Sequence, residues 1–153
     1  MVSLITDEHR ARIGVQSDPI PVRIREQDFR YVREVLEDRD PRYADGTGNA
    51  ALYGMSILEP RPVGGLSANI VPKILPSGIL TQTEWTTHRT LKVEEQLYAR
   101  HQVVDIRERL GGRFGRSVII LVHSEYRDDA GELVAETAHT VTQFDPAQGS
   151  SNS

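Results

Sequence analysis

Residues 37–45, EDRDPRYAD, are the most informative stretch of this chain. They bring together four carboxylates, a proline and a phenol, directly after an amphipathic helical pattern. In residues 26–37 the apolar side chains recur every three to four positions, which predicts a helix with one apolar face. Pro41 cannot continue that helix, and it biases Asp40 away from helical dihedral angles. An acidic loop of this kind is by itself only a solvated helix exit, so its meaning depends on the segments that follow.

A Gly-rich loop leads from this stretch to a second helical candidate in residues 62–72, with a proline at each end. Gly64 and Gly65 lie inside this candidate, and each lowers helix stability by about 1 kcal/mol relative to alanine. Such a helix persists only where tertiary packing supports it. We therefore expect a buried helix from residue 63 to about residue 70.

The rest of the chain has the pattern of β-structure. Residues 20–24 predict a short first strand, and longer strands are expected at residues 82–89, 95–109, 116–127 and 132–144. Glycine-bearing turns at residues 111–115 and 128–131 connect the last three of them. Helical segments followed by a run of strands indicate an α+β fold, with helices on one face of an antiparallel sheet.

The strand at residues 116–127 is unusual because VIILV, residues 118–122, is apolar on both faces. A strand covered on both sides has this composition. One helix covers only one face, so we expect the other face to contribute to an oligomer interface.

Length and composition indicate one globular domain, residues 1–144, followed by a polar segment, residues 145–153, that we expect to be disordered. The net charge is -4 and no basic stripe is present, so nucleic acid is not an expected partner. The longest apolar run is too short to cross a bilayer, and the first ten residues lack the apolar stretch of a signal peptide. We therefore expect a cytoplasmic protein without membrane contact.

The chain has no cysteine, which excludes disulfides, thiolate nucleophiles and cysteine-ligated metals. The five histidines are scattered along the sequence, without the spacing of a metal site. They are His9, His88, His101, His123 and His139. The sequence therefore predicts neither a metal site nor a cofactor, although a histidine from a neighbouring strand could still serve as a base.

The order of these segments resembles the MaoC-like, type-2 enoyl-CoA hydratase branch of the hotdog fold, whose motif reads Gly-Asp-x-Asn-Pro-x-His-x-Asp. Asp38, Pro41 and Asp45 match this motif, whereas Glu37, Asp40 and Tyr43 stand in place of its Gly, Asn and His. Residues 87–93, THRTLKV, are similar to the family's approach to a long strand, and residues 125–134 to its final hairpin. The likeness extends from about residue 13 to residue 144. It implies a hotdog fold, in which an antiparallel sheet wraps around a central helix.

The resemblance also implies a site for acyl thioesters of coenzyme A or acyl carrier protein. Asp38 and Tyr43 take the positions of the family's catalytic Asp and His, and Asp40 takes a substrate-binding position. Gly65 matches the glycine that opens the central helix, and Gly64 stands where a histidine would precede it. Backbone N–H groups there would stabilise a thioester oxygen as it gains charge.

The implied activity is a hydro-lyase of fatty acid metabolism, a hydratase or dehydratase of enoyl and 3-hydroxyacyl thioesters. A phenol has a reference pKa of about 10, against about 6.5 for imidazole, so Tyr43 is a weak base at neutral pH. This fits a degenerate subunit paired with an intact hotdog partner, although a homodimer is also open. The alternatives are a hotdog thioesterase, disfavoured because residues 63–71 hold no carboxylate, and a non-catalytic binding module.

Overall fold

The computed structural model of the chain describes residues 2–41, 47–48, 58–59, 69–113 and 115–149. The elements are α1 (Asp7–Ala11), β1 (Ile20–Ile24), α2 (Glu26–Val35), β2 (Thr47–Gly48), β3 (Leu58–Glu59), β4 (Ser77–Thr87), β5 (Leu91–Lys92), β6 (Leu97–Leu110), β7 (Arg116–Arg127), β8 (Leu133–Phe144) and α3 (Pro146–Gly149). None of the helices in these ranges has the length and apolar character that crossing a membrane requires.

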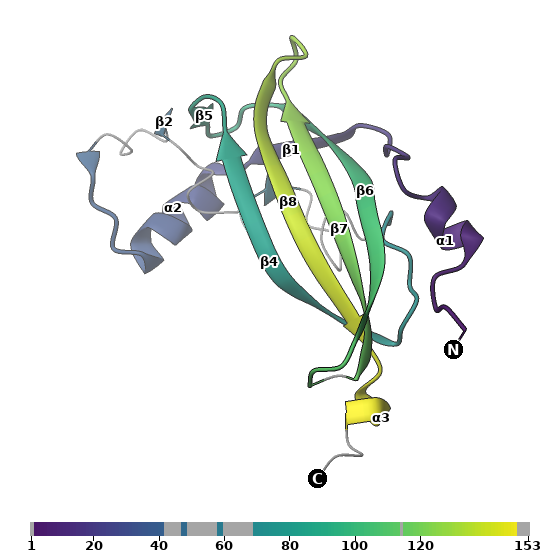
Figure 1. Cartoon of the computed structure of the whole chain (residues 1–153). Coiled ribbons are helices and arrows are strands. Elements are labelled where there is room, and N and C mark those ends of the chain that lie inside the picture. Colours follow the sequence, from purple (N-terminus) through teal and green to yellow (C-terminus); the bar gives the residue numbers. More distant parts are fainter. Residues whose placement is uncertain (1, 42–46, 49–57, 60–68, 114, 150–153) are drawn as a thin grey trace.

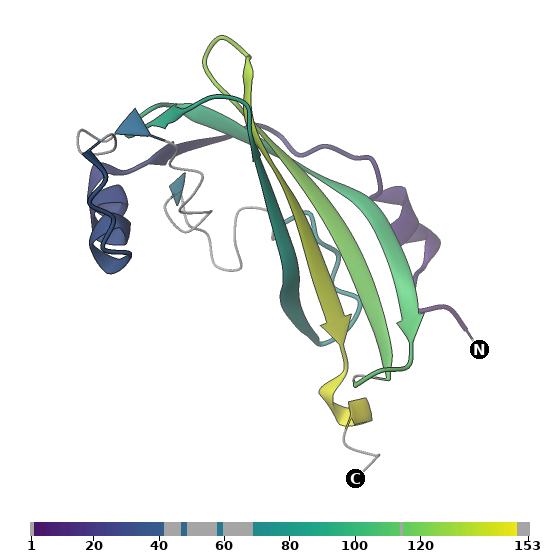
Figure 2. The same cartoon turned by 60° about the vertical axis from the view of Figure 1, so that its left-hand side comes forward.

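One antiparallel sheet dominates the fold, with the strand order β3-β1-β6-β7-β8-β4 (Figure 1). Its long strands bend together, as the turned view in Figure 2 shows. The predicted strand at residues 116–127 coincides with β7, and β6 and β8 lie within two residues of their predicted bounds. β4 begins five residues before the predicted start, because Ser77 and Gly78 pair with the distant Phe144 and Gln143.

The inner face of β7 is buried along the length of the strand. On β7, alternate residues from Val118 to Tyr126 are at most 1% exposed: Val118, Ile120, Val122, Ser124 and Tyr126. Residues between them are half-buried and form the outer face. The sequence predicted a strand covered on both faces. The inner face of β7 is fully buried, whereas its outer face is only half-buried.

Two apolar clusters divide the inner face. The first brings Phe29 of α2 against Val22, Leu97, Ala99 and Tyr126, which places α2 on this side of the sheet. The second gathers Ile5, Val103, Ile106, Val118, Ile120 and Val122, with Ile70, Val71, Ile74 and Leu75 packed against it.

The helix predicted for residues 63–70 lies outside the described residues, except for a turn at Asn69 and Ile70. The segment after it is fixed by the buried side chain of Gln143. Its Nε2 donates to the carbonyl oxygen of Pro72 (2.7 Å), and its Oε1 accepts from the backbone N–H groups of Ile74 (2.8 Å) and Leu75 (3.0 Å). Residues 70–75 are thereby held against the inner face.

The segment after β8, for which the sequence predicted disorder, includes the short helix α3. Residues 150–153 lie outside the described residues.

A belt of polar side chains crosses the inner face between the two apolar clusters. His101 Nδ1 lies 2.7 Å from Ser124 Oγ, and His139 Nδ1 lies 3.2 Å from Thr83 Oγ1. Among the described residues, neither Nε2 atom has a hydrogen-bond partner. Burial, and secondarily the nearby His139, lowers the pKa of His101 to about 4, and burial also lowers the pKa of His139. Both rings are therefore neutral in the folded protein at neutral pH.

Helix α2 ends two residues before the predicted residue 37, in a Schellman turn. The N–H of Glu37 donates to the carbonyl of Glu34 (3.1 Å), and the N–H of Asp38 donates to the carbonyl of Arg33 (2.9 Å). Glu37 has a φ of 52°, in the left-handed region that favours glycine. The helix therefore ends at Glu37, whose Cβ disfavours the left-handed conformation that this turn requires.

Replacing Glu37 by glycine should stabilise the protein. Glycine removes the Cβ that disfavours the left-handed conformation, although its greater freedom in the unfolded chain offsets part of the gain. We expect the free energy of unfolding to rise by about 0.5–1 kcal/mol in urea denaturation. Glu37→Gln is the matched control, since it removes the charge and keeps the Cβ. Equal stabilities for the two variants would contradict the account of this turn.

The buried histidine pair should make the protein sensitive to mild acid. An unfolded histidine has a pKa of about 6.5, so the stability contributed by neutral His101 and His139 is present above that pH and is lost as the pH falls toward about 4. Urea denaturation between these values should show a falling free energy of unfolding. His101→Gln, which cannot titrate, should flatten this slope, whatever its effect at neutral pH. A wild-type slope in His101→Gln would refute the assignment.

Candidate active site

The Schellman turn places Asp38 at the start of the acidic loop. The Oδ1 atom of Asp38 accepts a hydrogen bond from the backbone N–H of Asp40, two residues further along the chain, at 3.0 Å. Aspartate commonly closes a turn in this way. Both residues are half-buried, so the loop is neither a core segment nor a fully solvated helix exit.

Arg33, in the last turn of α2, holds the same loop from the other side. Its Nη2 donates to the carbonyl oxygens of Asp38 (3.2 Å) and Asp40 (3.1 Å). Basic side chains near a helix C-terminus often bind the carbonyls that the helix leaves free. One guanidinium thus fixes the backbone on both sides of Arg39, and with it the position of the Asp38 carboxylate.

A hollow of about 410 Å³ opens at this helix end. It is lined by Arg30, Arg33, Glu34, Glu37, Asp38 and Arg39. Arg30 also forms an ion pair with Glu26 one turn earlier in the helix. Guanidinium groups suit the phosphate or carbonyl oxygens of a ligand, and a carboxylate among them can accept or donate a proton. The hollow therefore holds three guanidinium groups and three carboxylates, and Asp38 is the carboxylate that the motif assigns to proton transfer.

The structure brings together two of the predicted site residues, Asp38 and Asp40. Tyr43, Gly64 and Gly65 lie outside the described residues. Arg33 is the residue that sequence reasoning missed. Its only sequence signal was a basic residue near the end of the predicted helix.

The segments 87–93 and 125–134, which carry the rest of the resemblance, are joined through Arg89. Its guanidinium pairs with Glu95, and its Nη2 also donates to Asp128 Oδ2 at 3.1 Å. The backbone N–H of His88 donates to the carbonyl of Val134 (3.0 Å). The turn before β5 is therefore anchored to the hairpin between β7 and β8.

The histidines fall into separate surroundings. His101 and His139 belong to the buried polar belt, whereas His88 and His123 both contact Glu136 on the outer face. No histidine is among the described residues that line the hollow at Asp38. Over the described part of the chain, a histidine in place of the family's catalytic base is thus not found beside Asp38.

No protein-family model matches the sequence, and no curated protein matches it closely enough to count as a relative. Solved structures do match the fold. A chain of the ChsH1-ChsH2 complex from Mycobacterium tuberculosis superposes with a TM-score of 0.74 at 19% identity, covering 90% of this chain and 94% of that one. A MaoC-like dehydratase gives a TM-score of 0.63 at 20% identity over 90% of this chain, which spans 44% of that longer chain.

The HadBC (3R-hydroxyacyl-ACP dehydratase) complex, also from Mycobacterium tuberculosis, gives a TM-score of 0.56 at 13% identity, with 84% of this chain and 99% of that chain covered. These identities are low, and the likeness is one of architecture. With its curved antiparallel sheet and its inner face covered by α2 and residues 70–75, the chain has the hotdog fold of the MaoC-like dehydratases.

Proposed function

We propose that this protein is a hydratase or dehydratase component acting on enoyl and 3-hydroxyacyl thioesters of coenzyme A or acyl carrier protein. The solved structures with this fold include a MaoC-like dehydratase and a 3R-hydroxyacyl-ACP dehydratase complex. Fold alone does not assign an activity, so the proposal depends on the residues at the end of α2.

The observation that carries the proposal is the backbone at Glu37 and Asp38. The MaoC-like motif begins with a glycine directly before its catalytic aspartate, and Glu37 occupies that glycine position. Its φ of 52° is the conformation that a glycine would adopt freely. The local geometry thus supports the register of the motif in which Asp38 is the catalytic carboxylate.

In the proposed reaction, water adds across the double bond of a trans-2-enoyl thioester. The water oxygen bonds to the β carbon, its proton is taken up by a base, and an acid delivers a proton to the α carbon. Dehydration is the reverse. Asp38 would exchange a proton with the water, and Arg33 would position Asp38 by holding the carbonyl groups of Asp38 and Asp40.

Tyr43 would be the second group at this site, in the position of the family's histidine. Its phenol is a weak base at neutral pH, although it could donate a proton or orient the thioester. A partner hotdog subunit would then supply the basic group that this chain lacks, while this chain contributes Asp38 and helps to form the acyl channel. Two of the structures with the same fold are complexes of two named components, ChsH1 with ChsH2 and HadBC.

The outer face of the sheet supports the proposal of an oligomer, either a homodimer or a heterodimer. Ile119 and Leu121 of β7 are only half-buried there, and Val104 of β6 is 43% exposed. The edge strand β4 also exposes most of its residues, including Leu80. A long, exposed edge strand can pair with a strand of another chain.

A non-catalytic acyl-thioester-binding module is the second candidate, and the tyrosine in place of the family's histidine favours it. The two candidates differ in whether this chain's own carboxylate takes part in turnover. The next two experiments separate them.

Asp38→Asn should lower hydratase activity by about 100-fold or more, because the amide cannot exchange a proton with water. The asparagine Oδ1 can still accept the hydrogen bond from the N–H of Asp40, so the loop should keep its shape. The assay follows the loss of enoyl-thioester absorbance, with a partner subunit present if one is required. Glu37→Gln, next to it on the same turn, should cost little. Equal losses for the two variants would show that the site is misplaced.

Tyr43→His should raise the activity of the chain measured alone. An imidazole with a pKa of about 6.5 is a far better base at neutral pH than a phenol. Wild type and variant are compared in the same absorbance assay on a trans-2-enoyl-CoA. Robust wild-type turnover that the substitution abolishes would make Tyr43 a functional residue and overturn the degenerate-subunit proposal. Thioester binding without turnover in either protein would favour the binding module.

A further inference from the structure

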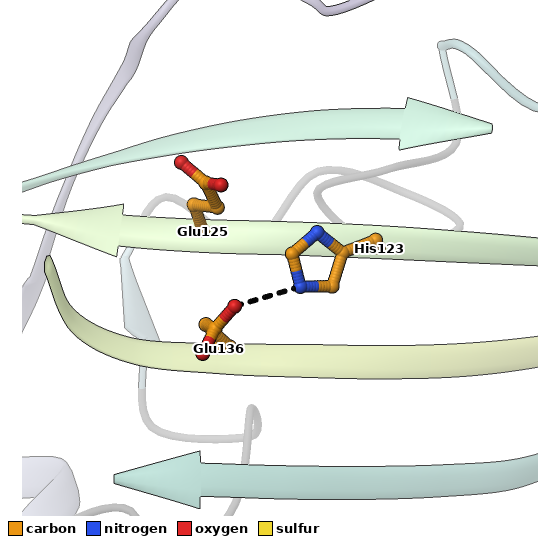
Figure 3. Close-up of side chains that lie close together, drawn as sticks. All are labelled: His123, Glu125 and Glu136. Atoms are coloured by element: carbon orange, nitrogen blue, oxygen red, sulfur yellow. Dashed lines mark hydrogen bonds and ion pairs between the residues drawn. The ribbon is translucent and has the colours of Figure 1, made fainter. Parts of the chain in front are cut away.

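A cluster of metal-ligating side chains lies on the outer face of the sheet, apart from the loop at Asp38. Figure 3 shows His123 and Glu125 on β7 and Glu136 on the adjacent β8. One ligand atom from each of the three lies within 4.8 Å of the others, and all three side chains are half-buried. This is the one such group among the described residues.

Strand pairing creates the cluster. Glu125 and Glu136 are direct partners across the β7–β8 ladder, and His123 lies two residues before Glu125 on the same face. His123 Nε2 is 3.0 Å from Glu136 Oε1, and His88 Nε2 is 2.6 Å from the other oxygen of that carboxylate. Glu136 therefore bridges two imidazoles, and Glu125 faces it from the next strand.

Two carboxylates directly opposite each other on paired strands repel. Here each has a cationic or hydrogen-bonding neighbour: Arg127 Nη2 lies 3.0 Å from Glu125 Oε2, and the two imidazoles face Glu136. The same negative charge would be neutralised more directly by a cation held between the two strands.

We propose that His123, Glu125 and Glu136 bind a divalent transition-metal ion, with zinc as the best fit. One imidazole nitrogen and two carboxylate oxygens form a donor set that zinc accepts, with bonds of about 2.0–2.2 Å. In tetrahedral geometry such ligand atoms lie about 3.4 Å apart, close to the 3.0 Å already separating His123 Nε2 from Glu136 Oε1. Side-chain rotation of Glu125 and release of Arg127 complete the set. Water or His88 takes the fourth position.

The ion would link β7 to β8 and stabilise the sheet. The inference is independent of the proposed hydro-lyase activity, which depends on the far end of α2.

The test is a calorimetric titration of the untagged chain with ZnCl₂, together with Co²⁺ as a spectroscopic reporter of tetrahedral geometry. We expect one ion per chain, a higher unfolding temperature with Zn²⁺ and no such rise with Mg²⁺. His123→Gln and Glu136→Gln should each weaken binding by about tenfold or more. His9→Gln and Glu132→Gln, away from the cluster, should bind as the wild type does.

Several results would overturn the proposal. They are the absence of saturable binding in the wild type, binding unchanged in both cluster variants, and binding lost in His9→Gln. Both cluster residues lie on the outer face, so circular dichroism should show a native sheet in the variants. If either variant fails to fold, Glu125→Gln takes its place in the same titration and should weaken binding in the same way. A wild-type affinity in that variant would count against the site.

Discussion

The buried inner face of β7 is the constraint on which the rest of the structure depends. Alternate side chains from Val118 to Tyr126 are at most 1% exposed, so this face must be covered along the full length of the strand. α2 covers one end through Phe29, and residues 70–75, held by Gln143, cover the other. The polar belt at His101 and His139 lies between these two coverings. Because α2 must dock on the inner face, its C-terminal turn and Asp38 are placed with it.

Local patterns predicted the elements that depend on local sequence. The apolar run in β7 and the turns on either side of it fixed the bounds of that strand. The start of β4 was missed because it is set by pairing with Phe144, a partner that the sequence does not indicate. The end of α2 was placed two residues late, because a glutamate at a left-handed position runs against the preference for glycine.

Only those residues of the candidate site that belong to a sequence motif could be predicted. Asp38 and Asp40 follow from the acidic stretch, and the structure brings them together. Arg33 could not be singled out, since a side chain that binds backbone carbonyls leaves no spacing pattern. The cluster at His123, Glu125 and Glu136 was equally hidden, because it depends on the register between β7 and β8. Charged and imidazole groups on the outer face look like an ordinary solvated surface in sequence.

The central claim is the proposal that an acyl thioester binds in the hollow at the end of α2. The most direct measurement is an NMR titration of the ¹⁵N-labelled chain with a saturated acyl-CoA, which can bind but cannot be hydrated. The account predicts saturable shifts of the amides of Arg33, Asp38 and Asp40. Shifts confined to the outer face around His123, or none at millimolar ligand, would contradict it.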